Sequence, residues 1–157
     1  FLARRLNEDA QSPWFKLIRC GGHSTSGLRR RTSLRMMQHA IQRFLSQTKC
    51  NERMAIEDLA QLLIAYWRAV ASVFEMEWSN HRANLITKGI GLYGLTQLLA
   101  TILSIQGGEQ YSESYFVGFL KQLKGRINWR ADGTFSSAGG HKGAGEVHSL
   151  LKGLLGL

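Results

Sequence analysis

The stretch from Ile64 to Ile105 constrains the fold more than any other part of the sequence. It holds two of the four tryptophans and the densest apolar pattern of the chain. Apolar residues between positions 56 and 74 recur at helical spacing and trace a wide face over about five turns, and we expect this helix to close near Trp78. Those between positions 92 and 103 keep the same spacing. The two patterns predict two long helices that supply much of a hydrophobic core.

The segment from Gly89 to Gly108 carries no charged residue over twenty positions, a length that can span a bilayer. Glycine, threonine, serine and glutamine dilute its apolar character, so we interpret it as a buried core helix. Gly89, Gly91 and Gly94 would each cost about 1 kcal/mol inside a helix relative to alanine. We therefore expect close approach of another backbone or an irregular helix start. A phosphate-cradling GxGxxG loop is the alternative, although no strand precedes it.

The length of 157 residues fits one domain, which can bury roughly 70% of its unfolded surface. Further helical patterns lie at 1–6, from 33 to 45, from 112 onward, and at 146–155, while 14–20 and 127–135 are candidate extended segments. The expected class is mainly α: a compact helical domain of about five helices with one or two short extended segments. We expect residues 1–157 to be a fragment of a longer polypeptide, because the chain opens FLARRLNED without methionine.

Few residues support a catalytic or metal-dependent chemistry. Cys20 and Cys50 lie thirty positions apart without a CxxC motif, so free thiols in a reducing cytoplasm are expected. Arg4 and Arg5 interrupt the N-terminal segment, which therefore does not resemble a signal peptide. The five histidines show no zinc-ligand spacing with the cysteines, and no Gly-x-Ser-x-Gly elbow occurs. We expect no metal and no cofactor, and leave open whether the chain is part of an enzyme.

The charge balance favours an acidic partner. Twenty Lys and Arg against eleven Asp and Glu give a net charge of +9, which favours contact with nucleic acid or another acidic surface. The alternative is a solvated basic face, or a face that covers an acidic part of a larger protein. Four arginines fall within residues 28–35, just before a helix that Thr32 or Ser33 should cap. Arginines at a helix N-terminus are unfavourable unless an anion lies among them.

Two segments supply the candidate phosphate contacts. After the arginine cluster, cationic side chains recur every four residues on a helix face separate from the apolar one. The Gly-rich segment 136–145 precedes the final predicted helix, where backbone N–H groups and a lysine can hold a phosphate, although it lacks the order of a Walker loop. The predicted nucleic-acid-binding residues are Arg29, Arg30, Arg31, Arg35, His39, Arg43 and Lys142.

Several landmarks occur in an order that resembles the C-terminal part of the DGQHR-domain family, which includes the DndB-like proteins of DNA sulfur modification. The matching pieces, in chain order, are LARRLNED, SPWFKLIRC, RTSLRMMQHAIQRFL, AYWRAVASVFEMEW, ITKGIGLYGLTQLLATIL and FSSAGGHKGAGEVHSLL. They cover nearly the whole chain. The Asp-Gly-Gln-His-Arg signature of the family belongs to its N-terminal part and does not occur in this sequence, so no family catalytic residue is carried over.

The resemblance implies a prokaryotic protein linked to DNA modification or restriction, often with DNA-binding or regulatory roles. It also implies that residues 1–157 are the C-terminal part of a longer α/β-containing protein. The leading hypothesis is a DNA-associated, non-catalytic helical module that contacts phosphates through its basic helix start. The alternative is a structural module that docks on its own N-terminal part or on a partner protein. Neither hypothesis involves a membrane.

Overall fold

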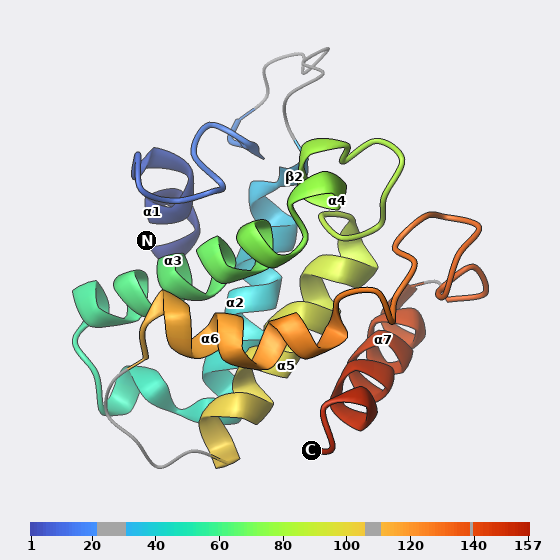
Figure 1. Cartoon of the computed structure of the whole chain (residues 1–157). Coiled ribbons are helices and arrows are strands. Elements are labelled where there is room, and N and C mark those ends of the chain that lie inside the picture. Colours follow the sequence, from blue (N-terminus) through green and yellow to red (C-terminus); the bar gives the residue numbers. More distant parts are fainter. Residues whose placement is uncertain (22–30, 106–110, 139) are drawn as a thin grey trace.

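The mainly α prediction is confirmed by a computed structural model, which describes residues 1–21, 31–105, 111–138 and 140–157. Within these ranges the chain forms seven α-helices, rather than about five, together with two short 3-10 helices and one pair of two-residue strands (Figure 1). In chain order the elements are α1 (Leu2–Glu8), β1 (Ile18–Arg19), β2 (Thr32–Ser33), α2 (Leu34–Thr48), η1 (Cys50–Glu52), α3 (Ile56–Val73), α4 (Glu75–Ser79), α5 (Gly89–Ile105), α6 (Glu113–Leu120), η2 (Lys121–Leu123) and α7 (Gly140–Leu154).

Two helix boundaries differ from those expected. The helical pattern that continues to Trp78 is interrupted at Phe74, whose backbone (φ −108°, ψ 49°) leaves the helical region. Phe74 is buried and packs edge-on against Trp129, with ring centroids 5.7 Å apart. At the C-terminal end, α7 begins at Gly140 rather than at Glu146. Gly140, Gly143 and Gly145 therefore belong to the helix, because its Ala144 and Val147 pack closely against Gly94 of α5.

The extended segments are shorter than expected. In 14–20 only Ile18–Arg19 forms a strand, which pairs in parallel with Thr32–Ser33. Asn7 holds the preceding residues in turns: its backbone oxygen accepts from the Lys16 N–H and its Oδ1 accepts from the Ile18 N–H, both at 2.9 Å. Lys16 itself has a positive φ of 58°. In 127–135 the chain turns, since the Gly133 N–H donates to the Arg130 oxygen at 2.9 Å.

Helix α5 is the centre of the fold, with α2 and α7 packed against it (Figure 1). Its glycines confirm the prediction of close packing. A Cβ at Gly91 would collide with the backbone oxygens of Leu85 and Ile86, and one at Gly94 would lie 2.5 Å from Val147 Cγ1. Most residues of α5 are buried, so the interpretation as a core helix is confirmed. Among the helices of the described residues, none combines the length and apolarity needed to cross a bilayer.

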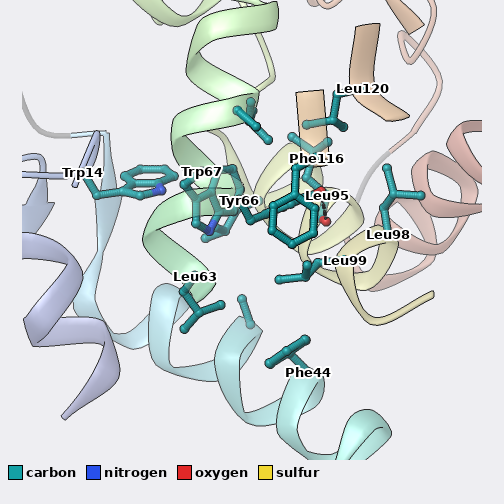
Figure 2. Packing of buried hydrophobic residues seen from close by; sticks show 14 of the residues in the cluster. Trp14, Phe44, Leu63, Tyr66, Trp67, Leu95, Leu98, Leu99, Phe116 and Leu120 are labelled. Atoms are coloured by element: carbon teal, nitrogen blue, oxygen red, sulfur yellow. Dashed lines mark hydrogen bonds between the residues drawn. The ribbon is translucent and has the colours of Figure 1, made fainter. Parts of the chain in front are cut away.

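Aromatic side chains of α3 contact the segment before β1 and helix α6. Trp67 meets Trp14 edge-on with centroids 5.2 Å apart, and Tyr66 meets Phe116 of α6 at 5.2 Å (Figure 2). The buried Tyr66 hydroxyl donates to the Leu95 backbone oxygen at 2.6 Å, which ties α3 to α5. This bond satisfies a polar group that would be costly to bury alone. Both cysteines are free, as expected; Cys50 is buried and Cys20 half-buried.

Candidate anion-binding surface

The half-buried Arg31 makes contacts within the protein. Its Nη1 donates to the Trp78 backbone oxygen at 2.6 Å, and its guanidinium lies over the Trp78 ring, 5.1 Å from the centroid. Its backbone N–H donates to the Leu17 oxygen at 2.8 Å. Burial lowers the pKa of Arg31 below its usual range. These contacts make Arg31 an anchor that fixes the start of α2 against the end of α4.

Three of the predicted residues form one exposed row on α2. Arg35, His39 and Arg43 are spaced by four positions, so they lie along one face about 6 Å apart per step. The opposite face of α2 is buried through Met37, Ile41 and other apolar residues. The helix begins as expected, since the Ser33 hydroxyl accepts from the Met36 N–H at 3.2 Å. The row is therefore held on a well-anchored helix.

The loop between α4 and α5 brings further positive charge to the start of α2. Arg82 and Lys88 are exposed on this loop, and a Cβ at the neighbouring Gly89 would lie 2.9 Å from Met36 Cε of α2. Burial lowers the pKa of His81, and Arg31, Lys88 and Arg82 lower it further. Three cationic side chains therefore lie around the His81 imidazole, whereas a salt-bridged surface would pair such cations with carboxylates.

Acidic residues are absent from the segments that build this surface. Residues 10–51 contain eight Lys and Arg and no Asp or Glu, and residues 78–108 contain no Asp or Glu. The ion pairs in the described part of the chain join Arg5 to Asp9 and Glu57, Arg68 to Glu113, and Arg130 to Asp132. None of them involves α2 or the loop 80–88. We define the basic surface as Arg35, His39, Arg43, Arg82 and Lys88.

A polar row on α5 borders the same surface. Tyr93, Gln97 and Thr101 are four positions apart and share one face of a helix that is otherwise largely apolar. Gln97 faces Arg43 of α2, and the Thr101 hydroxyl lies 2.8 Å from His148 Nε2 of α7. Burial lowers the pKa of His148, and Lys152 adds to this shift. The row therefore connects α2 and α7 through polar contacts.

A surface pocket of about 330 Å³ lies where α2 meets α5. His39, Arg43 and Tyr93 line it together with Gln42, Ser46 and Gln47. Among the described residues, the side chains that line it are positive or neutral and include no carboxylate. An anion with a planar or apolar part fits such a lining chemically.

The remaining predicted residues do not join this surface in the described structure. Arg29 and Arg30 lie outside the described residues. Lys142 is exposed on the first turn of α7, and α5 separates that helix from α2 (Figure 1). The described residues also hold no group of three or more His, Cys, Asp or Glu that could bind a metal ion.

Several residues of the surface were not predicted from the sequence. Arg82 and Lys88 stand in the loop 80–88, which carries no motif, and the bordering Gln97 lies in a largely apolar helix. The signal that could have found them is the long absence of acidic residues in 78–108. Comparison with family models, with curated proteins and with solved structures gives no match to this chain.

Proposed function

We propose that this chain is a DNA-associated, non-catalytic helical module that contacts phosphates through its basic surface. The observation that carries the proposal is the exposed set of cations on α2 and the loop 80–88, without a carboxylate partner among the described residues. Lys and Arg in this arrangement gain affinity by neutralising phosphates and releasing counterions. The resemblance to DGQHR-domain proteins supports the same proposal, with the prokaryotic cytoplasm and DNA modification or restriction as the setting.

The mode of contact follows from the shape of the surface. The cations project from one helix face and one loop, and the hydrogen bond from Arg31 to the Trp78 oxygen ties the start of α2 to the end of α4, from which the loop 80–88 leaves. Contacts of this kind position a protein on the backbone of nucleic acid without reading bases. We therefore propose binding that depends strongly on salt and little on sequence.

Removing the surface charges should weaken duplex binding more than removing the same charge elsewhere. We expect Arg35→Ala, Arg43→Ala, Arg82→Ala and Lys88→Ala, combined in one variant, to lower duplex affinity at least about tenfold at low salt, because each phosphate contact contributes to counterion release. The slope of log K against log salt should fall by about 0.9 for each phosphate that the variant no longer neutralises. Fluorescence anisotropy with a labelled duplex at several salt concentrations measures both quantities.

A matched control removes four exposed cations from other elements: Arg4, Lys121, Lys124 and Lys152. This variant has the same net charge as the first and should keep most of the duplex affinity. Equal decreases in the two variants would contradict a localised binding surface. Docking would be supported instead if the wild type bound no duplex but formed a stable complex with the segment that precedes it in a longer protein.

Duplex affinity should also rise as the pH falls. The pKa of His81 is lowered by burial and by Arg31, Lys88 and Arg82; a phosphate placed among these cations would raise that pKa again. The bound state then takes up a proton at a pH where the free protein does not, so lower pH favours binding. We expect tighter binding at pH 5.5 than at pH 7.5 and a flatter pH profile for His81→Gln. Identical profiles for the two proteins would rule out phosphate contact near His81.

A further inference from the structure

We infer that the pocket between α2 and α5 binds a single nucleotide unit, with its phosphate on Arg43 and His39 and its base against Tyr93. This inference deepens the proposed function, on which it rests for its choice of a nucleic-acid ligand. It separates one recognition site from the broader basic surface. Arg35, Arg82 and Lys88 belong to that surface but do not line the pocket.

Arg43 is held in a fixed position. The Gln97 amide is oriented with its oxygen towards the guanidinium, because the opposite orientation would set N–H groups against N–H groups. In this orientation the oxygen accepts from Arg43 Nη2 at 2.6 Å and from Nη1 at 3.3 Å. Gln97 is only 7% exposed, so its amide rests on a core helix and has little freedom. Gln97 is therefore a positioning residue that holds a cation at the rim of the pocket.

This cation is oriented without being neutralised. An arginine is more often held by a carboxylate, which cancels its charge. Here the acceptor is a neutral amide, and among the described residues no carboxylate lies within ion-pair distance of Arg43. A guanidinium has five N–H donors, of which the amide oxygen uses two. The remaining donors and the full charge can serve an anion.

The other groups that line the pocket also suit a nucleotide. His39 stands one turn before Arg43, and Gln42, Ser46 and Gln47 add neutral side chains that can donate hydrogen bonds. Tyr93 provides an aromatic surface at the same pocket. A phosphate beside an aromatic side chain is the arrangement by which proteins hold single nucleotides and unpaired bases. The volume of about 330 Å³ is at the lower end for ligand pockets, so one nucleotide matches it better than a longer segment.

The test uses the whole chain and isothermal titration calorimetry with adenosine 5′-monophosphate, adenosine and inorganic phosphate as probes. We expect the monophosphate to bind more tightly than adenosine or phosphate alone, since it fills both parts of the pocket. Arg43→Gln should lower its affinity at least about tenfold, as removal of a charge-assisted hydrogen bond predicts. Gln97→Leu, which keeps the side-chain volume but removes the acceptor, should reduce affinity for the monophosphate while leaving that for adenosine unchanged.

Thermal unfolding of each variant shows whether the fold is retained, and the triple variant Arg35→Ala, Arg82→Ala, Lys88→Ala is the control. It should lose duplex affinity but bind the monophosphate as the wild type does. Duplex binding without any monophosphate binding would overturn the pocket assignment alone. Monophosphate binding without duplex binding would overturn the proposed function alone. Equal affinity for adenosine and its monophosphate would overturn the role of Arg43.

A last comparison identifies the source of the nucleotide. A short single-stranded oligonucleotide with a 5′-phosphate is titrated beside the free monophosphate and the same oligonucleotide without the phosphate. Tighter binding of the phosphorylated oligonucleotide supports a strand end as the ligand. Tighter binding of the free monophosphate supports a free nucleotide. Equal binding of the two oligonucleotides, together with no effect of Gln97→Leu on either, would count against a phosphate site.

Discussion

Alanine at position 91 should destabilise the protein by about 3 kcal/mol, because overpacking of a rigid contact cannot be relieved by side-chain movement. A Cβ there would lie 2.5 Å from the backbone oxygen of Ile86 and closer still to that of Leu85. Both atoms belong to the turn that leads into α5, so relief requires a shift of the helix itself. Urea unfolding followed by circular dichroism measures the decrease in stability. The displaced helix carries Tyr93 and Gln97, so the binding pocket should be disturbed as well.

Gly145 offers a matched control within another helix. It lies in α7, and a Cβ at this position would meet nothing within 4 Å. Gly145→Ala should therefore stabilise the protein by about 0.5–1 kcal/mol through the higher helix propensity of alanine. Two identical substitutions are thus expected to change stability in opposite directions. Similar effects at the two positions would contradict the close contact between Gly91 and the preceding turn.

The parts of the fold that the sequence predicts well are those set by local patterns. The apolar spacing in α2, α3 and α5 identifies these helices, because each buries one face or, in α5, nearly its whole surface. Ser33 was recognisable as an N-cap, and its hydroxyl accepts from the Met36 N–H as expected. Helical period and capping act within a few residues, so they can be recognised without tertiary information.

The parts that the sequence does not predict depend on contacts between distant residues. The glycines at the start of α7 look like a loop by composition, yet the helix continues through them because Ala144 and Val147 pack against Gly94. Tertiary packing overrides helix propensity in this case. Likewise, the four-arginine cluster looks like a uniform basic segment, whereas Trp78, which is 47 positions away, draws Arg31 into an internal contact.

In the candidate site, too, local patterns could be predicted and contacts between distant residues could not. The exposed row of α2 follows from a spacing of four positions and was predicted. Its partners were not, since Gln97 lies 54 positions after Arg43 and carries no motif. The pairing of a buried amide with an exposed guanidinium arises only when α2 packs on α5. Sequence reasoning therefore finds the charged side of the site but misses the core residue that orients it.

Trp67→Ala should cost about 4 kcal/mol of unfolding free energy, in the range measured for removal of a large aromatic side chain from a core. Trp67 is almost fully buried and contacts the rings of Trp14 and Trp78, with centroids 5.2 Å and 6.2 Å away. The cavity left by the indole would remove the contacts of α3 with Trp14 and with Trp78. Trp67→Phe keeps part of the ring contact and should cost clearly less. Urea unfolding with tryptophan fluorescence distinguishes the two variants.

The effect of Trp67→Ala should extend to the basic surface. Trp78, which rests on Trp67, is the ring beneath the Arg31 guanidinium, and Arg31 joins the start of α2 to the end of α4. Greater mobility of Trp78 would weaken this contact between α2 and α4, so duplex affinity should fall in Trp67→Ala even under conditions where the variant remains folded.

Met76→Ala is the control, because Met76 is 82% exposed and its removal should change stability by less than about 0.5 kcal/mol. If the two variants unfold at the same urea concentration, the tryptophan cluster does not support the fold. If Trp67→Ala binds duplex as well as the wild type, the arrangement of the basic surface is independent of that cluster.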